Sequence, residues 1–287
     1  MSAVLTFNQT GIINVFLFHI YFKQENSFKW LIHFFIWWCW RKVMVQRARC
    51  KTGIEVLDSE LNGGFPIGST ILISGASGVG KTTLCMQFLS NGAKLGDKGV
   101  FFTATETISK LKKFQGGYSF FDENYIKNGQ LSIIDLWSIS DRLGLHPERY
   151  NLEEANVLFE VIRDITKELG AKRLIIDSIT SLCYRLQTRE MIRDFIFKLG
   201  SSLSAMMCTT LLTSETPPMV FQYSQDEIVE FISDGIIFLG DTERKGDLMK
   251  TLQVVKMRGT SHGRTKYVLS MSRKNGIELA PMLKTSI

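Results

Sequence analysis

The stretch Ile71–Thr83 reads ILISGASGVGKTT and decides the fold. A β-branched apolar run stops at Gly75, a glycine-rich loop follows, and apolar residues then resume with helical spacing. This order predicts a strand, a phosphate-binding loop and a helix. The loop fits the pattern G-x-x-x-x-G-K-T, with Gly80, Lys81 and Thr82 at the fixed positions after Gly75.

The loop residues have the chemistry that a nucleoside triphosphate needs. Glycines let backbone N–H groups turn inward around the phosphates, and a helix that begins there points its positive end at the anion. Lys81 can reach the β- and γ-phosphate oxygens, and Thr82 can offer its hydroxyl to Mg²⁺. The alternative is a chance βα turn, which the Lys-Thr pair in this context disfavours. We therefore predict that ATP and Mg²⁺ are bound by Gly75, Ala76, Ser77, Gly78, Val79, Gly80, Lys81, Thr82 and Thr83.

The composition is that of an ordinary globular chain. Of the 287 residues, 45% are hydrophobic and 22% are charged, which is enough for a sizeable core. The formal charge of +6 is modest, so basicity alone does not select a nucleic-acid partner. The five cysteines form no C-x-x-C pair, which indicates neither a disulfide framework nor a zinc site. We therefore expect a reducing, cytoplasmic location.

Residues 1–43 differ from the rest and hold four of the five tryptophans. Their apolar runs, Gly11–Phe22 and Leu31–Trp40, are shorter than the roughly 18 to 20 residues that span a bilayer, so we predict no transmembrane span. Because the composition turns ordinary at Met44, we expect translation to begin there, with the first 43 residues an upstream extension. The alternative is an aromatic anchor at a membrane interface. A native peptide from residues 1–40, found by mass spectrometry, would exclude the start at Met44.

Residues 44–287 have the pattern of one α/β domain. We predict strands at 71–75, 99–106, 131–137, 173–178 and 206–214, alternating with helices at 81–95, 109–114, 151–170 and 188–204. Such alternation is typical of a mostly parallel sheet covered by helices on both faces. Segments 116–130 and 138–150 read as irregular loops. After Pro218 we predict strands without helices, and hence an antiparallel C-terminal extension, at 235–239, 249–258 and 265–270.

Three carboxylates end predicted strands. A phosphate-loop site needs a second carboxylate on a neighbouring strand to hold the water shell of Mg²⁺, and Asp177 at the end of RLIID fits this need. Its alternative role is to cap the following turn. Glu106 would lie at the carboxyl edge, where it can orient or deprotonate the attacking water, or it is simply an exposed glutamate at a helix start. Glu215 is the next candidate for the base.

Several further strings, in matching order, carry a family resemblance. They are TGIEVLD, GGFPIGS, GVFFTATET, LIIDS, IVEFISDGIIFL and KMRGTSH. With the phosphate loop, they make about residues 50–280 resemble the KaiC-like branch of the RecA superfamily of ATPases. The resemblance implies a RecA-type core assembled into a homo-oligomeric ring, here expected to be a hexamer, with ATP at each subunit interface.

The family's K-x-R-G-x-x-H string falls on Lys256, Arg258, Gly259 and His262. The resemblance implies that Lys256 and Arg258 reach the γ-phosphate bound by the neighbouring subunit, and that His262 contacts the nucleotide. The physics agrees, since alternate residues of a strand point the same way and cations stabilise the charge of the transition state. From the residues alone, a solvated basic edge is an equally good interpretation.

Two departures from the family affect the expected activity. The family usually has adjacent catalytic glutamates where this chain has Thr105–Glu106, so we expect slow hydrolysis. Family members with an autokinase half have a Ser-Thr acceptor pair where this chain has Glu230 and Phe231. We therefore expect the chain to resemble the ATPase half, without phosphorylation at these positions.

Three functions remain open from the sequence. The first is a ring-forming ATPase of low turnover that drives conformational or regulatory change, with a protein partner. The second is a recombination accessory that binds single-stranded DNA: segment 138–150 offers Arg142, His146 and Arg149, whereas 216–227 has no basic residue. The third is an interaction module with a structural nucleotide. Candidate contact residues for it, more simply interpreted as buried loop anchors, are Phe120, Phe121, Phe221 and Tyr223.

Overall fold

A computed structural model describes residues 48–146, 148–216, 227–244 and 246–282. The chain divides into two units, Met1–Gln46 and Arg47–Ile287, and the description below concerns the second. The predictions for residues 1–43, including the start at Met44, lie outside the described residues. So do Phe221 and Tyr223.

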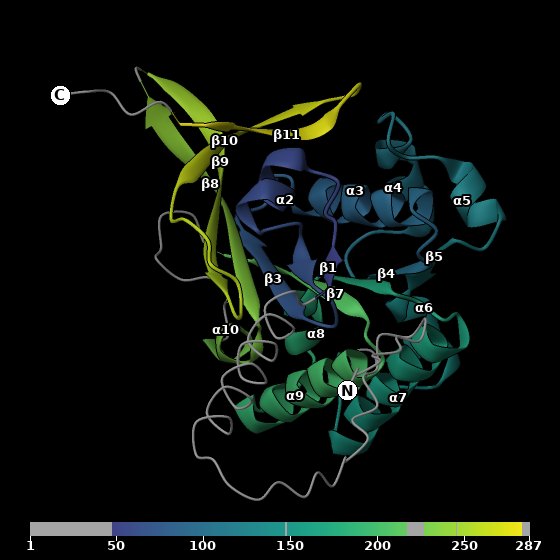
Figure 1. The fold of residues 1–287 in the computed structure, drawn as a ribbon. Helices are drawn as coiled ribbons and strands as arrows, with labels where there is room; N and C mark the ends of the chain where they lie inside the picture. Colours follow the sequence, from purple (N-terminus) through teal and green to yellow (C-terminus); the bar gives the residue numbers. More distant parts are fainter. Residues whose placement is uncertain (1–47, 147, 217–226, 245, 283–287) are drawn as a thin grey trace, which may run out of the picture. The chain divides into compact units, whose positions relative to one another are not determined.

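Within the described residues, a nine-stranded sheet has the order β11-β10-β9-β8-β3-β7-β6-β4-β5 (Figure 1). The strand from Gly235, expected in the antiparallel extension, instead pairs in parallel with the strand at Thr70–Gly75. Six neighbouring strands thus run parallel, five of them as predicted. They are β3 (Thr70–Gly75), β4 (Gly99–Thr103), β5 (Leu131–Asp135), β6 (Arg173–Asp177), β7 (Thr209–Glu215) and β8 (Gly235–Arg244). One strand, β7, separates the strand that leads into the phosphate loop from the strand that ends at Asp177.

The C-terminal strands form the predicted antiparallel extension. They are β9 (Asp247–Met257), β10 (Lys266–Ser272) and β11 (Gly276–Pro281), each antiparallel to its neighbour. The β8–β9 hairpin is longer than predicted, because pairing continues to Arg244 opposite Asp247. A separate two-stranded ribbon joins β1 (Arg49–Cys50) to β2 (Phe65–Pro66).

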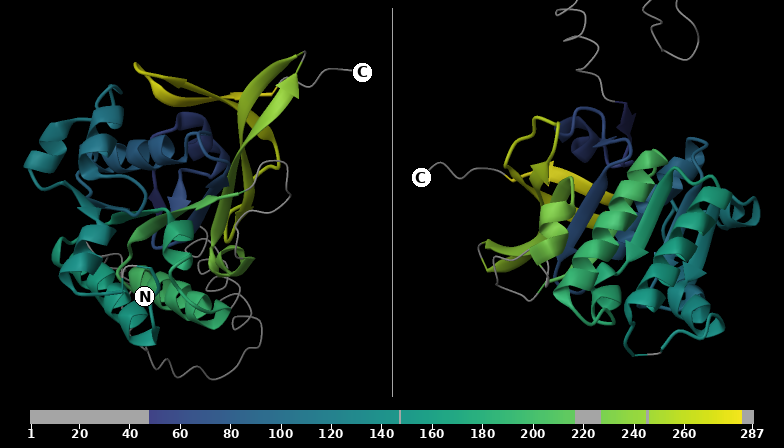
Figure 2. Two further views of the ribbon diagram at one scale, coloured as in Figure 1. Left: turned by 180° about the vertical axis from the view of Figure 1, so that it is seen from behind. Right: turned by 90° about the horizontal axis from the view of Figure 1, so that it is seen from below.

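Helices cover both faces of the parallel strands. Figures 1 and 2 show α2 and α3 on one face and α7 and α9 on the other. The helices are α2 (Glu55–Glu60), α3 (Lys81–Lys94), α4 (Ile108–Gln115), α5 (Glu123–Lys127), α6 (Leu136–Arg142), α7 (Leu152–Glu168), α8 (Ile179–Cys183), α9 (Arg189–Ala205) and α10 (Glu227–Ile232).

Alternate residues of the strands supply two cores, one on each face of the sheet. Ile71 and Ile73 of β3 belong to the same buried cluster as Leu84 of α3. Leu72, between them, belongs to a second cluster with Leu199 of α9. Both faces of β3 are therefore buried, which explains its continuous apolar run in the sequence.

The two long helices on the second face begin where the sequence predicted. Asn151 caps α7, and its side chain and that of Glu154 form a reciprocal capping box. Thr188 caps α9 by accepting a hydrogen bond from the backbone N–H of Met191. Gly170 ends the α7 segment with a φ of +62°.

Several predicted boundaries are wrong, and short polar caps are the reason. The strand predicted to end at Glu106 ends at Thr103, whose hydroxyl bonds to both the backbone N–H and the carbonyl of Glu106 and closes a turn. Segment 138–150 was expected to be a loop, but α6 begins before it, where the side chain of Asp135 accepts from the N–H of Trp137. In the same way, Asp122 starts α5 inside segment 116–130.

Candidate nucleotide site

Four strands place polar residues at one edge of the sheet. Because the strands run parallel, their carboxyl ends meet at the same edge. In the register, Gly75 lies opposite Glu215, and Thr103 lies opposite Asp177. The phosphate loop and two of the three candidate carboxylates therefore share this carboxyl edge.

The phosphate loop is glycine-rich for reasons of packing as well as binding. A Cβ on Gly75 would lie 2.2 Å from the carbonyl oxygen of Leu239, and a Cβ on Gly80 would lie 2.9 Å from the sulfur of Met271. Gly80 is also the N-cap of α3, with a φ of +113° and no side-chain cap. Because no cap side chain occupies the first turn of α3, this turn is available to an anion, and the loop fits a polyphosphate.

Lys81 is held over the loop. Its Nζ donates to the carbonyl oxygens of Gly75, at 2.7 Å, and of Ala76, at 2.8 Å. The residue is only 7% exposed. Burial lowers the pKa of Lys81, and the nearby charges of Glu215 and Asp177 oppose that shift. The ammonium is therefore positioned where phosphate oxygens can replace the loop carbonyls.

Asp177 contacts one threonine of the phosphate-loop segment and one threonine of β7. Its carboxylate accepts from Thr82 Oγ1 at 2.7 Å and from Thr213 Oγ1 at 2.5 Å. Burial raises the pKa of Asp177, while hydrogen bonds from Thr213 and Thr82 act to lower it. The capping alternative is wrong, because Ser178 is the residue that caps α8. A hydroxyl beside a carboxylate is a suitable donor set for Mg²⁺ and its water shell.

Thr213 was not among the predicted site residues. It is fully buried near the end of β7, so in the sequence it reads as one more strand residue. The only signal was the polar ending of the apolar strand TTLLTSE. Its role as a donor to Asp177 depends on β7 lying beside β6.

Glu106 does not end β4 as predicted, but lies in the loop between β4 and α4. Its carboxylate is 3.2 Å from Lys110 Nζ, in an ion pair one helical turn apart. Its negative charge nevertheless contributes to the raised pKa of Asp177, so it acts electrostatically on the same site. Glu215 is exposed at the end of β7, and its charge acts on Lys81.

Lys256 and Arg258 lie away from the phosphate loop of their own chain. Lys256 Nζ donates to the carbonyl oxygens of Ser233, at 2.7 Å, and Glu230, at 3.1 Å. Arg258 donates to the carbonyl of Phe231 at 3.0 Å. Burial, then the charge of Arg258, lowers the pKa of Lys256.

Both cations therefore contact the end of α10, and they share one side as the sequence predicted. That end precedes β8 at the amino edge of the sheet, where the N–H of Asp234 donates to the carbonyl of Thr70. The amino edge is opposite the edge that carries the phosphate loop. The structure thus brings residues 75–83 together with Asp177, but not with Lys256 and Arg258.

His262 belongs to the loop between β9 and β10. Its Nδ1 is 2.8 Å from the carbonyl oxygen of Gly263. A shallow cavity of about 510 Å³ beside it is lined by residues of this loop and of α2, including Ser59 and Glu60.

Lys250 contacts the phosphate loop and was missed in the sequence. Its Nζ donates to the carbonyl oxygen of Gly78 at 2.9 Å. It lies on β9, the same strand as Lys256, and opposite Asp241 of β8. No local pattern marks it, because the register of the β8–β9 hairpin brings it to the loop.

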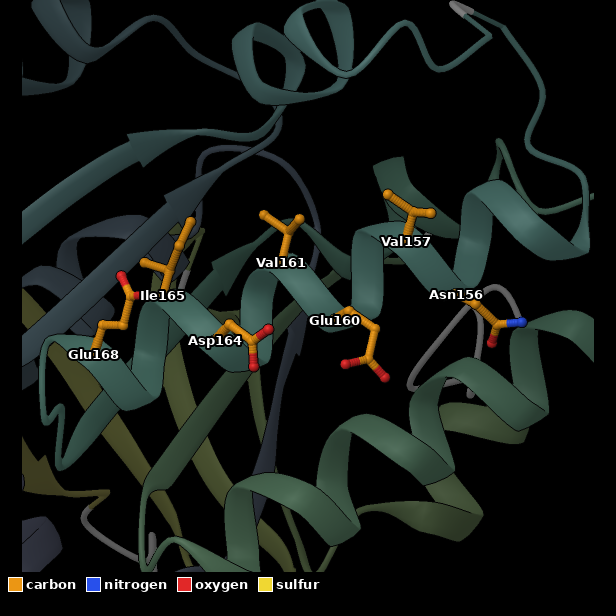
Figure 3. Close-up of a pocket in the computed structure, with 7 residues that line it drawn as sticks. All are labelled: Asn156, Val157, Glu160, Val161, Asp164, Ile165 and Glu168. Atoms are coloured by element: carbon orange, nitrogen blue, oxygen red, sulfur yellow. The ribbon is translucent and has the colours of Figure 1, made fainter.

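Other parts of the surface carry less chemistry. A groove of about 370 Å³ lies along α7. Figure 3 shows three of its lining residues, Val157, Val161 and Ile165, in one row of the helix. Two carboxylates of the neighbouring row, Glu160 and Asp164, are already paired with Arg163. The groove lies on the face opposite α3 and contains none of the predicted site residues.

The described residues have neither a metal-binding cluster nor a membrane-spanning helix. No group of three or more His, Cys, Asp or Glu there could hold a metal ion. None of the helices described is long and apolar enough to cross a bilayer. The four cysteines of the described residues, Cys50, Cys85, Cys183 and Cys208, are buried and form no disulfide.

Comparisons with known proteins point in the same direction as the geometry. A family model described as "ATPase: KaiC" matches residues 50–284. A UPF0273 protein of Thermotoga maritima is 34% identical over 236 residues, which cover 81% of this chain and 96% of that protein. The circadian clock oscillator protein KaiC of Parathermosynechococcus lividus is 30% identical over 236 residues, but these cover only 42% of its length.

A solved structure extends this likeness to the fold. The crystal structure of a KaiC-like protein, PH0186 of Pyrococcus horikoshii OT3, matches with a TM-score of 0.70 and 34% identity. The match covers 82% of this chain and all of that one. The predicted family and the α/β fold with its antiparallel extension are therefore confirmed. This chain belongs to the KaiC-like family of RecA-type ATPases and contains a single domain of that type.

Proposed function

We propose that this protein binds ATP with Mg²⁺ and hydrolyses it slowly at the subunit interfaces of a homo-oligomeric ring, a hexamer in the cytoplasm. Hydrolysis would drive conformational or regulatory change in a protein partner. Family membership supports nucleotide binding and ATPase chemistry. The observation that carries the proposal is that the two predicted halves of the catalytic machinery lie at opposite edges of one sheet.

The strand register supports this separation. Gly75 pairs with Leu239 of β8, whereas Lys256 pairs with Ile236 on the other side of β8. Three residues along the strand are roughly 10 Å, and the two strand spacings between β9 and β3 add roughly 10 Å sideways. A lysine side chain that already contacts Ser233 does not cover that separation. Lys256 and Arg258 are therefore better placed to act on a neighbouring subunit than on their own.

Within one subunit, the described residues suit binding and proton transfer. Lys81 and the N–H groups of the loop would bind the β- and γ-phosphates, and Thr82 and Asp177 would hold Mg²⁺, the latter through water. Bound Mg²⁺ would neutralise charge on the phosphates. Glu106 would accept the proton of the attacking water after leaving Lys110. With a single glutamate that is already ion-paired, we expect low turnover.

The test compares hydrolysis and assembly. The full chain and a form beginning at Met44 are measured for mass in solution and for ATP turnover with Mg²⁺, beside Glu106→Gln and Arg258→Ala. We expect ATP to promote a ring and both substitutions to lower turnover, Arg258→Ala by about 1,000-fold and Glu106→Gln by about 100-fold. Nucleotide affinity should change much less than turnover, because Lys81 and the N–H groups of the loop still bind the phosphates in both variants.

The matched control is Arg193→Ala, which removes an exposed cation from α9 and should leave turnover unchanged. A chain that stays monomeric and turns over no ATP would instead support the interaction module with a structural nucleotide. Single-stranded DNA binding that weakens steeply with salt, and is lost in Arg142→Ala and Arg149→Ala, would support the recombination accessory.

A further inference from the structure

The loop that follows Arg258 is fastened to the N-terminal lead-in of the domain. Residues 259–263 lie between β9 and β10, and most of them are exposed. Arg49 Nη1 donates to Thr260 Oγ1 at 2.7 Å, and Asn62 Nδ2 donates to the carbonyl of Ser261 at 3.0 Å. The loop is therefore attached to residues about 200 positions earlier in the chain.

Glu60 makes the most direct of these attachments. One oxygen of its carboxylate accepts from the backbone N–H of Gly263, and the other accepts from the hydroxyl of Tyr267 at the start of β10. Both bonds are charge-assisted, which makes them stronger than bonds between neutral groups. A Cβ on Gly263 would lie 2.9 Å from Glu60 Oε1, so the approach is close.

The partner of Glu60 is a stable donor. Burial, with the hydrogen bond to Glu60 and its charge, raises the pKa of Tyr267 to about 12. The phenol therefore stays protonated at physiological pH. The Glu60 carboxylate joins the last residue of the loop to a strand of the sheet, and so fixes the exit of the loop.

We propose that Glu60 is a positioning residue for the trans-acting segment. By holding Gly263 and Tyr267, it keeps the 259–263 loop, and with it Arg258 and His262, in the orientation that meets the nucleotide of the neighbouring subunit. This inference rests on the proposed function. It also connects the N-terminal helix α2 with the neighbour's site, although α2 touches no predicted catalytic residue.

The first test needs no catalysis. In the full chain, amide hydrogen exchange of residues 259–263 should be faster in Glu60→Ala than in the wild type, by about tenfold or more. Glu55→Ala is the matched control, because it removes an exposed carboxylate from the same helix. Tyr267→Phe, which removes only one of the two bonds, should have a smaller effect. Unchanged exchange in Glu60→Ala would overturn the proposal.

The second test uses mixed assemblies. Glu60→Ala should lower ATP turnover by about tenfold while leaving ATP affinity within about twofold, because the phosphate loop is untouched. Glu60→Gln should recover part of the loss, since its amide can still bond to both partners. Mixing Glu60→Ala with Lys81→Ala should restore turnover. The Lys81→Ala subunits supply an intact 259–263 loop, and the Glu60→Ala subunits supply an intact phosphate loop. Mixing it with Arg258→Ala should not, because neither subunit then has an intact trans-acting segment.

A reference mixture of Arg258→Ala with Lys81→Ala distinguishes the positioning role of Glu60 from the proposed function. If Arg258→Ala and Lys81→Ala complement each other while Glu60→Ala and Lys81→Ala do not, the positioning role of Glu60 is wrong and the trans-acting site stands. If the reference mixture also fails, the trans assignment is wrong, and the role of Glu60 falls with it.

Discussion

Two lysines on one strand contact opposite edges of the sheet. Lys250 and Lys256 lie on β9, six residues or about 20 Å apart. Lys250 donates to the phosphate loop of its own chain, whereas Lys256 donates to the carbonyls at the end of α10, at the opposite edge of the sheet. The antiparallel extension thus reaches both edges, and one strand can serve the site of its own subunit and, as proposed, that of a neighbour.

The two edges are built differently. At the carboxyl edge, Lys81 and Asp177 are buried, and their polar atoms contact loop carbonyls and threonine hydroxyls of the same site. At the amino edge, Arg258 is half exposed, with 54% of its side chain accessible. A buried site tolerates little change, whereas an exposed cation such as Arg258, whose contacts are the Phe231 carbonyl and an ion pair with Asp234, can be removed at a smaller cost to folding.

The largest effect on folding is expected at the base of the phosphate loop. In Gly75→Ala, the new Cβ would meet the Leu239 carbonyl at 2.2 Å, and neither strand can move without breaking the sheet. We expect a loss of about 3 kcal/mol in the free energy of unfolding, with ATP binding abolished. Urea denaturation measures the free energy of unfolding, and nucleotide titration measures ATP binding.

Gly78→Ala is the matched control within the same loop. A Cβ there has nothing within 4 Å, so the remaining cost comes from the φ of +80° and should be about 1 kcal/mol. Equal losses of unfolding free energy in the two variants would show that the cost of a side chain in the loop comes from backbone conformation alone, and not from the contact with β8.

A smaller effect, with a characteristic pH dependence, is expected from Asp177→Asn. Because burial raises the pKa of Asp177 above 3.8, the folded state holds this proton more tightly than the unfolded state does. The wild type should therefore lose stability relative to the variant as the pH rises from about 3.8 through the raised pKa. At neutral pH, Asp177→Asn should be the more stable of the two, yet hydrolyse ATP about 100-fold more slowly.

The free energies of unfolding of the wild type and of Asp177→Asn, measured at about pH 4 and about pH 7, test the predicted direction of this pH dependence. A wild type that gains stability relative to Asp177→Asn over this range would show that Thr82, Thr213 and Lys81 outweigh the burial of the carboxylate. Thr213→Val is a useful comparison, because it removes one of the two donors to Asp177 without changing its charge.

The sequence predicted those parts of the molecule whose signals are local. The phosphate loop has fixed spacing, and Asp177 follows an apolar run, so both could be assigned with no knowledge of the sheet. The long helices α7 and α9 have caps and long periodicity. The short helices α5 and α6 have too few residues for their periodicity to be recognised. Each starts at an aspartate, which is as typical of a turn as of a helix cap.

The missed contacts depend on tertiary structure. Lys250 and Gly78 are 172 residues apart, and Glu60 and Gly263 are 203 residues apart. Neither pair can be inferred without the strand order and the hairpin register. The end of β4 was misjudged for a similar reason, because the turn that Thr103 closes with Glu106 competes with the strand for the same residues.

The smallest effect concerns Lys250 and tests the division of labour along β9. Because Lys250 donates one solvent-exposed hydrogen bond to the loop, Lys250→Ala should weaken ATP binding by only about two- to threefold, with turnover at saturating ATP nearly unchanged. Lys167→Ala, which removes an exposed cation from α7, controls for the loss of charge. The decisive measurement is the mixture with Lys81→Ala. A defect in the subunit's own loop is not repaired by a neighbour's cations, so the ATP affinity of the Lys250→Ala subunits should stay low, whereas the turnover lost in Arg258→Ala should recover in its mixture with Lys81→Ala. Recovery in the mixture would mean that Lys250, like Lys256 in the proposed ring, acts across the interface.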